Sequence, residues 1–344
     1  MWKYIFDQVA DLSAIKKIQV APPIPGPQEV LVKVKAVSLN RADLLMLTGF
    51  RPQGTSSIPG LAPLMDAAGE VVAAGQKVTR WKIGDRVMPT ILRSWISGDF
   101  SPAGQGPRPG WTVEGVLAEQ ISVDEQALVR IPEFLSDEEA ATLPCAGLTA
   151  WNSLFDRHFP LQAGEDVLVL GTGGVSVFAT QFATLAGANV IDTSSSDAKL
   201  DQVKTWGAVR TINYRTDPSW GDTVRRLTDG RGVDHVVETV GAPTLEQSFR
   251  SVKLGGAIHL VGVLGRGTID PELFRNTRGY LRAVAIGSRD QFEAMTRAIS
   301  ARQLKPVIAK VFPLEEVAAA YTHLRDESPV GKVVIRTTSP KPHI

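Results

Sequence analysis

The stretch Val167-Leu168-Val169-Leu170-Gly171-Thr172-Gly173-Gly174-Val175-Ser176 decides the fold of this 344-residue chain. An apolar run stops at Gly171, and an apolar segment of helical character begins at Gly174. Gly171 permits a tight turn, and Gly173 lets the backbone approach a ligand closely. The first turn of a helix adds free N–H groups and a partial positive charge. The stretch therefore predicts a strand, a phosphate-binding loop and a helix, with Ser176 replacing the last glycine of a G-x-G-x-x-G pattern.

The region around this loop alternates between short apolar runs and helical segments. The runs predict strands at 167–170, 189–193, 210–213, 234–238, 257–263 and 281–286. Helices are expected at 174–186, 197–206, 219–228 and 243–253, with a weaker one after Asp270 and another from Arg289 to about Ala301. Six strands joined by crossover helices indicate an α/β fold with a doubly wound parallel sheet of the Rossmann type.

The first 127 residues have a different rhythm of short strands and turns. Val30, Val32 and Val34 alternate with more polar neighbours, and apolar runs at 69–74 and 85–88 end near glycines. This pattern predicts a small, mostly antiparallel β-domain, to which a last strand at 332–336 returns. The segment 91–111, with four Gly, three Pro and two Trp, is expected to be a lid, a binding loop or a disordered insert.

The amino-acid composition excludes several classes of binding partner. The chain has 37 basic and 36 acidic residues, a net charge of +1, so no nucleic acid or acidic membrane surface is expected as a partner. No apolar run is long enough to span a bilayer, and the N-terminus lacks a signal-peptide pattern. The single Cys145 excludes an internal disulfide, and the five histidines have no metal spacing, with His235 and His259 interpreted as structural. A cytoplasmic protein with a small-molecule substrate is expected.

The chain resembles the medium-chain dehydrogenase/reductase superfamily, in its zinc-free, quinone-oxidoreductase-like branch. The resemblance covers nearly the whole length, through motifs at 27–43, 69–72, 84–87, 143–151, 171–176, 230–234 and 331–334. It implies a GroES-like, mostly antiparallel catalytic domain of residues 1–146, completed by 289–344. A Rossmann dinucleotide-binding domain of residues 147–288 is implied between these two parts.

The resemblance also bears on metal binding. Zinc enzymes of the superfamily have Cys where this chain has Asn40, and His-Glu where it has Met65-Asp66, so that Cys145 alone matches a ligand position. A catalytic zinc needs three protein ligands and an open position. We therefore expect no metal.

Asn40 and Asp43 are the candidate catalytic residues. They match a pair near the nicotinamide in zinc-free relatives, where Asn40 would hold the carboxamide or a substrate oxygen and Asp43 would support it. The alternative is a helix-capping pair. Cys145 is either a reactive thiol or, as we favour, a small buried hydrophobe.

Cofactor contacts are expected from the phosphate loop, from the carboxyl ends of the strands and from positions that match relatives. For Tyr214 the alternative is packing on the sheet rim, and for Lys332 it is a solvated charge. The candidate residues are Thr149, Gly171, Thr172, Gly173, Gly174, Val175, Ser194, Ser195, Lys199, Tyr214, Thr239, Val240, Gly262, Val263, Leu264 and Lys332.

Residues at the end of the strand predicted at 189–193 favour NADPH as the cofactor, with NADH as the weaker one. The ribose position of NAD-dependent relatives falls on Ser194, and Ser195 and Lys199 suit a 2′-phosphate. Asp192 is expected on the same face as Ser194, where its charge would oppose that phosphate and keep the preference moderate.

These features predict zinc-independent hydride transfer to a quinone, a conjugated enone or an aldehyde. Without a metal, such a site relies on positioning and hydrogen-bond donors, and an extended π-system spreads the incoming charge. An NAD(P)-dependent alcohol dehydrogenase and a non-catalytic NADPH-binding sensor are the alternatives. By resemblance, the chain is expected to form a homodimer through the strand at 281–286, because an apolar edge strand needs a cover.

Overall fold

The computed structural model describes residues 1–6, 12–47, 60–262, 265 and 267–337. The chain divides into two compact units. Unit 1 comprises Met1–Leu148 and Ile286–Ile344, and unit 2 comprises Thr149–Ala285. Within the described ranges, every helix is too short or too polar to span a membrane.

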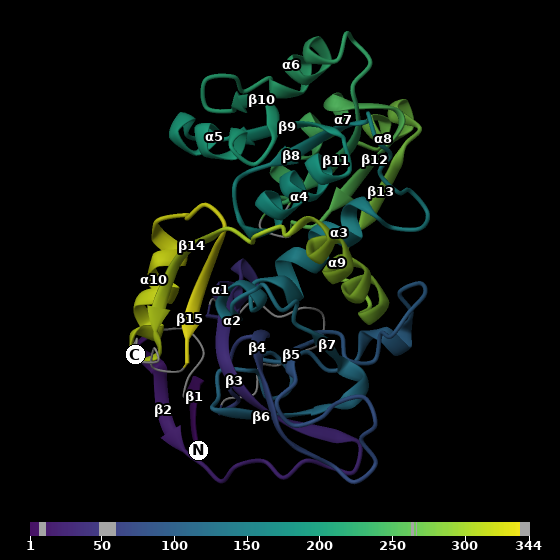
Figure 1. Cartoon of the computed structure of the whole chain (residues 1–344). Coiled ribbons are helices and arrows are strands. Elements are labelled where there is room, and N and C mark those ends of the chain that lie inside the picture. Colours follow the sequence, from purple (N-terminus) through teal and green to yellow (C-terminus); the bar gives the residue numbers. More distant parts are fainter. Residues whose placement is uncertain (7–11, 48–59, 263–264, 266, 338–344) are drawn as a thin grey trace. The chain divides into compact units, whose positions relative to one another are not determined.

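Unit 2 contains a six-stranded parallel sheet in the order β10-β9-β8-β11-β12-β13 (Figure 1). The strands are β8 (Asp166–Leu170), β9 (Asn189–Ser194), β10 (Ala208–Asn213), β11 (Val233–Glu238), β12 (Val252–Leu260) and β13 (Tyr280–Ala283). The helices are α4 (Gly174–Leu185), α5 (Asp197–Lys204), α6 (Trp220–Leu227), α7 (Ala242–Ser251) and α8 (Pro271–Thr277).

The strand order reverses at β8, which lies between β9 and β11. In a doubly wound sheet, ligands bind in the crevice outside the carboxyl ends of the strands at this reversal. The core beside it is made of apolar strand residues such as Leu168, Ile191 and Val236, all fully buried. The predicted Rossmann sheet is therefore confirmed, and the phosphate loop after β8 lies at its switch point.

Two predicted strand ends are wrong. The strand predicted at 257–263 ends at Leu260, because the N–H groups of Val261 and Gly262 both donate to the carbonyl of Glu238, each at 2.9 Å. The strand predicted at 281–286 ends at Ala283, and Ile286 has a φ of 38°, which no strand contains. Apolar composition continues past both points, although the backbone turns away.

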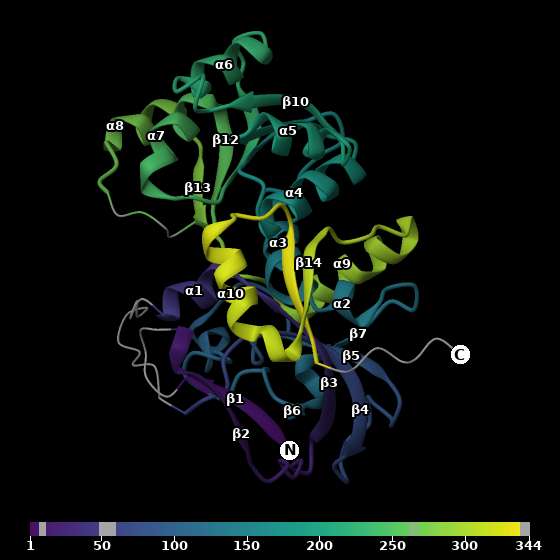
Figure 2. The same ribbon diagram turned by 90° about the vertical axis from the view of Figure 1, so that its left-hand side faces the viewer.

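Unit 1 contains a sheet in the order β14-β15-β3-β4-β5-β7, with β6 also paired to β3, and a separate β1-β2 hairpin. Among the described strands of this sheet, β14 and β15 are the parallel neighbours. Figure 2 shows strand β14 and helix α10, which come from the C-terminal part of the chain, in yellow. The strands are β1 (Trp2–Phe6), β2 (Ile15–Gln19), β3 (Glu29–Leu39), β4 (Asp66–Ala74), β5 (Arg86–Pro89), β6 (Gln120–Asp124), β7 (Leu128–Arg130), β14 (Ile308–Pro313) and β15 (Lys332–Arg336).

The sequence pattern explains this sheet. Val30, Val32 and Val34 are buried as predicted, and β15 pairs antiparallel with β3, so the chain does return to the first unit. The helices of unit 1 are α1 (Arg41–Leu47), α2 (Asp137–Ala140), the π-helix η4 (Leu143–Gly147), α9 (Arg289–Arg302) and α10 (Val317–Asp326), and α3 (Leu148–Leu154) begins at its boundary. Four short 3-10 helices are η1 (Leu12–Ala14), η2 (Pro102–Gln105), η3 (Glu125–Ala127) and η5 (Leu314–Glu316).

The segment 91–111 is ordered rather than a disordered insert. Ile91, Trp95 and Trp111 are buried. The N–H groups of Arg289 and Asp290 donate to the carbonyls of Trp95 and Ile96, both at 3.0 Å, so the segment is tied to the start of α9. Its position in the unit leaves a binding role open.

Candidate functional site

A buried charged network lies where β3 ends. The ammonium of Lys332, at the start of β15, donates to the carbonyl of Leu39 at 2.8 Å, to Asn40 Oδ1 at 2.6 Å and to Asp66 Oδ2 at 3.1 Å. Lys332 is 3% exposed and Asp66 is 0% exposed. Each charge is costly to bury alone, so the pair depends on both partners.

The network also orients the amide of Asn40. Its Nδ2 donates to Asp66 Oδ2 at 2.9 Å, and Ser38 Oγ donates to the same oxygen at 2.9 Å. Because an ammonium only donates and a carboxylate only accepts, the oxygen of Asn40 must face Lys332 and its nitrogen must face Asp66. The side chain of Asn40 also acts on Asp43, whose pKa it lowers.

Asp43 caps the first turn of α1. The N–H of Asn40 donates to Asp43 Oδ2 at 2.7 Å, and the N–H of Asp43 donates to the carbonyl of Asn40 at 3.0 Å. The capping interpretation is therefore confirmed for the backbone, while the side chain of Asn40 points into the charged network. Burial raises the pKa of Asp43 to about 7, against the lowering effect of its bond from Asn40, and the charge of Asp66 adds to the rise.

The residues at the superfamily's zinc positions do not fit zinc. Between Asn40 and Asp66 a cation is already present, the ammonium of Lys332. Cys145 lies in the π-helix η4, and burial raises the pKa of its thiol well above the usual range, so that the thiol stays protonated. In the part of the chain that the structure describes, no three His, Cys, Asp or Glu residues are placed to hold a metal.

The phosphate loop of unit 2 has the geometry of an anion cradle. Gly173 is the N-cap of α4, with φ −75° and ψ −177°, and a Cβ built on it would meet no atom within 4 Å. Gly171 has a φ of 76°, which favours glycine. Ser176 Oγ donates to the carbonyl of Leu170 at 2.7 Å and so ties the helix to the strand. The open backbone at Gly173, together with the N-terminus of α4, suits a pyrophosphate.

The end of β9 combines hydroxyls with charges of both signs. Ser194 is buried, Ser195 is half-buried, and the half-buried Lys199 lies in the first turns of α5. The exposed Asp197 begins the same helix and accepts a hydrogen bond from the amide of Asn213 at 2.9 Å. This edge therefore offers groups for a 2′-phosphate and one carboxylate that opposes it.

Tyr214 and Thr149, two candidates for cofactor contact, differ in how exposed they are. Tyr214 is 41% exposed, and its N–H donates to the carbonyl of Ser194 at 3.0 Å, so its ring lies near the candidate ribose edge while remaining on the surface. Thr149 is buried on α3. Both remain candidates for cofactor contact.

Asp192 lies on the predicted face of β9, but its carboxyl is in the interior instead of at the ribose edge. It is fully buried, and both carboxyl oxygens lie within 3.0 Å of Thr180 Oγ1 on α4. Burial raises the pKa of Asp192 to about 8, so the group is mostly neutral at pH 7. Thr180 Oγ1 donates toward the carboxyl group of Asp192 and also lies 3.2 Å from the carbonyl of Ser176. Its predicted repulsion of a 2′-phosphate is therefore absent.

Replacement of Asp192 by Asn is expected to remove a pH dependence of stability. Because the pKa of Asp192 rises from 3.8 to about 8 on folding, the folded state keeps a proton that the unfolded state loses, and stability falls as pH rises through that window. The advantage of Asp192→Asn over the wild type should grow by about 1 kcal/mol per pH unit in this range. Urea denaturation at several pH values measures it, and a difference that does not change with pH would mean an ionised Asp192.

The ends of β11 and β12 complete the switch point. Thr239 Oγ1 donates to the carbonyl of Leu170 at 2.7 Å, and the carboxylate of Glu238 accepts from the N–H of Val240 at 2.9 Å. A Cβ on Gly262 would lie 2.3 Å from backbone atoms of Thr239 and Val240, so glycine is required there for close strand packing. The remaining candidates, Val263 and Leu264, lie outside the described residues.

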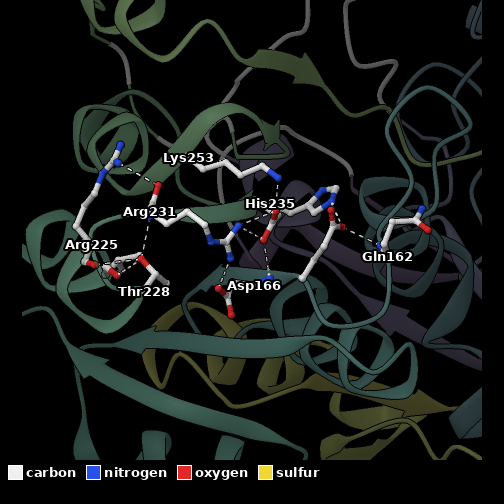
Figure 3. Close-up of polar contacts among 11 residues, drawn as sticks. Gln162, Asp166, Arg225, Thr228, Arg231, His235 and Lys253 are labelled. Atoms are coloured by element: carbon white, nitrogen blue, oxygen red, sulfur yellow. Dashed lines mark hydrogen bonds and ion pairs between the residues drawn. The ribbon is translucent and has the colours of Figure 1, made fainter.

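A second polar cluster lies at the opposite end of the same sheet (Figure 3). Arg231 donates to Asp166 and Asp234, and Lys253 pairs with Asp234. The rings of His235 and His259 are stacked and hydrogen-bonded at 2.9 Å, and burial lowers the pKa of both. Both rings are buried in this cluster, as the structural interpretation of the two histidines predicts. The cluster surrounds Asp166, which begins the strand whose other end carries the phosphate loop.

Ser38 and Thr180 were not identified from the sequence, and Asp66 was considered only at a zinc-ligand position of the superfamily. One feature of the sequence could have indicated that such partners exist, namely a carboxylate within an apolar strand, since a buried charge requires a partner. The partner itself could not be named, because Lys332 is 266 residues away from Asp66.

Comparisons with known proteins agree with this geometry. Residues 26–133 match the alcohol dehydrogenase GroES-like domain, and residues 174–301 match the zinc-binding dehydrogenase domain. A zinc-type alcohol dehydrogenase-like protein of Schizosaccharomyces pombe is 37% identical, covering 96% of this chain and 98% of that protein. The chain belongs to the medium-chain dehydrogenase/reductase superfamily. It is thus an oxidoreductase with a nicotinamide-dinucleotide-binding fold.

Other superfamily members differ in substrate and cofactor. The acryloyl-coenzyme A reductase of Metallosphaera sedula is 30% identical over 93% of this chain and 95% of that enzyme. A crystal structure of an NAD-dependent alcohol dehydrogenase superimposes with a TM-score of 0.89 at 31% identity, covering 98% of this chain and all of that one. A mycobacterial protein complexed with NADPH gives a TM-score of 0.81 at 25% identity, with coverage of 98% and 100%.

Proposed function

We propose that this superfamily member transfers hydride from NADPH to a conjugated carbonyl compound, an enone or a quinone, without zinc. The observation that carries the proposal is the network of Lys332, Asn40 and Asp66, which occupies the place of the metal with an ammonium and an oriented amide. When bound, the dinucleotide supplies the hydride.

The chemistry assigned to the chain is hydrogen bonding to a developing negative charge. The amide of Asn40 is held by Asp66 at Nδ2 and by Lys332 at Oδ1, and it is proposed to donate its other Nδ2 hydrogen to the substrate oxygen. A donor held in this way requires no reorganisation as an enolate oxygen forms. A delocalised enolate needs less stabilisation than the localised alkoxide of a simple ketone, so a site with one amide N–H favours conjugated acceptors.

The proposed preference for NADPH rests on Ser194, Ser195 and Lys199 at the end of β9. Asp192 is neutral and buried and so does not oppose a 2′-phosphate, but the exposed Asp197 does. The preference is therefore proposed to be moderate, on the order of tenfold in kcat/KM, which corresponds to about 1.4 kcal/mol.

Steady-state assays with NADPH and NADH against quinones, enones and aldehydes, and with NADP⁺ against alcohols, test this function. We expect turnover of enones and quinones with NADPH, and Lys199→Ala should raise KM for NADPH but not for NADH. Cofactor binding without turnover of any acceptor would instead identify a sensor. Turnover restricted to alcohols and simple aldehydes would identify an alcohol dehydrogenase.

We also propose a homodimer formed through β13. This strand ends the sheet of unit 2, and its Tyr280 is 61% exposed. An uncovered edge strand offers unpaired N–H and C=O groups that a second copy can satisfy. Light scattering at working concentration measures the mass, and a monomer would rule out this assembly.

A further inference from the structure

The turn at 108–113, in the loop after β5, brings Arg108 and Trp111 close together. The N–H groups of Trp111 and Thr112 donate to the carbonyl of Arg108 at 3.1 and 3.0 Å. Because Gly110 has a φ of 75°, the backbone at 108–111 forms a β-turn with glycine at its third position. Thr112 Oγ1 accepts from the N–H of Arg108 at 2.9 Å and closes the turn. The first and fourth residues of a β-turn have Cα atoms less than about 7 Å apart, so Arg108 and Trp111 are close neighbours.

This turn is fixed against the chain that leads into β4. A Cβ on Gly110 would lie 2.8 Å from the carbonyl oxygen of Leu64, and a Cβ on Gly115 would lie 2.4 Å from the same atom. The N–H of Val116 donates to that carbonyl at 3.0 Å. The turn thus packs directly beside Met65, the neighbour of Asp66 in the charged network.

Trp111 has an unused hydrogen-bond donor. The side chain is 9% exposed and packs in an apolar cluster with Met65 and Ile91, against the partly buried Cys145. Its indole Nε1 is shielded from solvent and has no hydrogen-bond partner among the described residues. A buried donor without a partner is costly, and buried Trp N–H groups usually find one. A ligand that enters beside Cys145 would supply the missing acceptor.

The guanidinium of Arg108, in the same turn as Trp111, is a positive charge without an ion-pair partner among the described residues. Arg108 is half-buried, and within the described ranges its guanidinium makes no hydrogen bond or ion pair. Besides burial, the charges that act on the Cys145 thiol are Asp66 and Asp43, which raise its pKa, and Lys332 and Arg108, which lower it. The guanidinium is therefore close enough to Cys145, which Trp111 also contacts, for its charge to act there.

The charges of this neighbourhood do not balance. Lys332 and Asp66 neutralise each other, and Asp43, with a pKa of about 7, carries at most part of a charge at neutral pH. One positive charge, that of Arg108, remains. A single guanidinium with a neutral N–H beside it matches a monoanion such as a carboxylate, which accepts two N–H bonds from an arginine fork, better than a phosphate with its charge of nearly −2.

We propose that Arg108 and Trp111 bind a carboxylate of the substrate, so that the natural acceptor is an enone or enal that carries a carboxylate group. The inference deepens the proposed function and rests on it for the reaction itself. The guanidinium pairs with the carboxylate, the indole N–H donates to one of its oxygens, and Asn40 remains available for the carbonyl oxygen.

The kinetic test compares 4-oxopent-2-enoate with the neutral pent-3-en-2-one, both with NADPH. In the wild type, kcat/KM should be higher for the acid. Arg108→Gln should lower kcat/KM for the acid by about 100-fold, mainly through KM, and change the neutral enone by less than about threefold. Arg108→Lys should recover part of the loss, and Trp111→Phe, which keeps the ring, should cost about tenfold for the acid alone.

A matched control removes a different arginine of unit 1. Arg302, at the exposed end of α9, is replaced by Gln, which makes the same change in net charge. This variant should behave as the wild type with both enones. An equal loss in Arg302→Gln would attribute the effect to general electrostatic attraction and overturn the proposal.

Calorimetry with the unreactive 4-oxopentanoate separates this proposal from the proposed function. Wild-type protein with bound NADP⁺ should bind this acid, and Arg108→Gln should not, even if neither enone is reduced. Absence of binding to the wild type, or equal binding to both proteins, would overturn the carboxylate site. A loss of NADPH affinity in Arg108→Gln with unchanged acid binding would assign Arg108 to a cofactor phosphate instead.

Discussion

Gly173→Val is expected to lower the affinity for NADPH by at least about 100-fold while leaving the fold intact. The backbone at position 173 has ordinary extended angles, and a Cβ there would meet no protein atom within 4 Å. A branched side chain therefore costs the free protein little. It would, however, cover the N–H groups at the start of α4, where a pyrophosphate must approach the backbone. Fluorescence titration with NADPH measures the affinity, and thermal unfolding without cofactor measures the fold.

The size of the side chain provides the control for this variant. Gly173→Ala should weaken binding less than Gly173→Val, with unchanged unfolding. Gly262→Ala should behave in the opposite way and destabilise the protein without cofactor, because its Cβ would lie 2.3 Å from the backbone of Val240. If Gly173→Val bound NADPH as the wild type does, the cofactor site would have to lie elsewhere.

Lys332→Met is expected to destabilise the protein by about 3–5 kcal/mol, because it leaves Asp66 charged and buried without its cation. The carbonyl of Leu39 and Oδ1 of Asn40 would lose their donor as well. The same variant should lower kcat/KM for enones, since the amide of Asn40 would no longer be oriented. Urea denaturation and steady-state kinetics measure the two effects.

A second substitution distinguishes loss of the ion pair from a packing defect. Without Lys332, the side chain of Asp66 is buried without its cation, so the cost should disappear when Asp66 itself is made neutral. Asp66→Asn in the Lys332→Met background should recover stability at neutral pH. Lys310→Met, at an exposed position of β14, serves as the control. A loss below about 1 kcal/mol in Lys332→Met would contradict a buried pair.

Local patterns determined most of the architecture. The alternation of Val30, Val32 and Val34 predicted which face of β3 is buried, and the glycines at 171 and 173 predicted the strand, loop and helix at the switch point. These predictions succeed because backbone conformation and side-chain periodicity depend on neighbouring residues. Ser176 also behaves as expected, since its hydroxyl bonds back to the carbonyl of Leu170.

Other features depend on partners far along the chain. Asp192 follows the strand alternation correctly, but Thr180 on the covering helix makes its face an interior one, so the carboxyl is neutral rather than a charge at the ribose edge. Similarly, the end of β12 is set by the carbonyl of Glu238 on the neighbouring strand. The apolar composition of the segment could not predict that β12 ends at Leu260, because the hydrogen bonds that end it are accepted by another strand.

The sequence by itself determined the two-part α/β architecture, the dinucleotide loop and the lack of a zinc ligand set, because each follows from residue types at short spacing. Only the tertiary structure decided which groups surround Asn40. The ammonium of Lys332 meets Asn40 and Asp66 because β15 pairs beside β3 and β3 pairs with β4. The fold likewise placed Trp111 against Met65 and Cys145. Charged side chains that are dozens to hundreds of residues apart in the sequence interact only after folding brings them together. The reason is that Coulomb energies depend on distance and burial rather than on position in the chain.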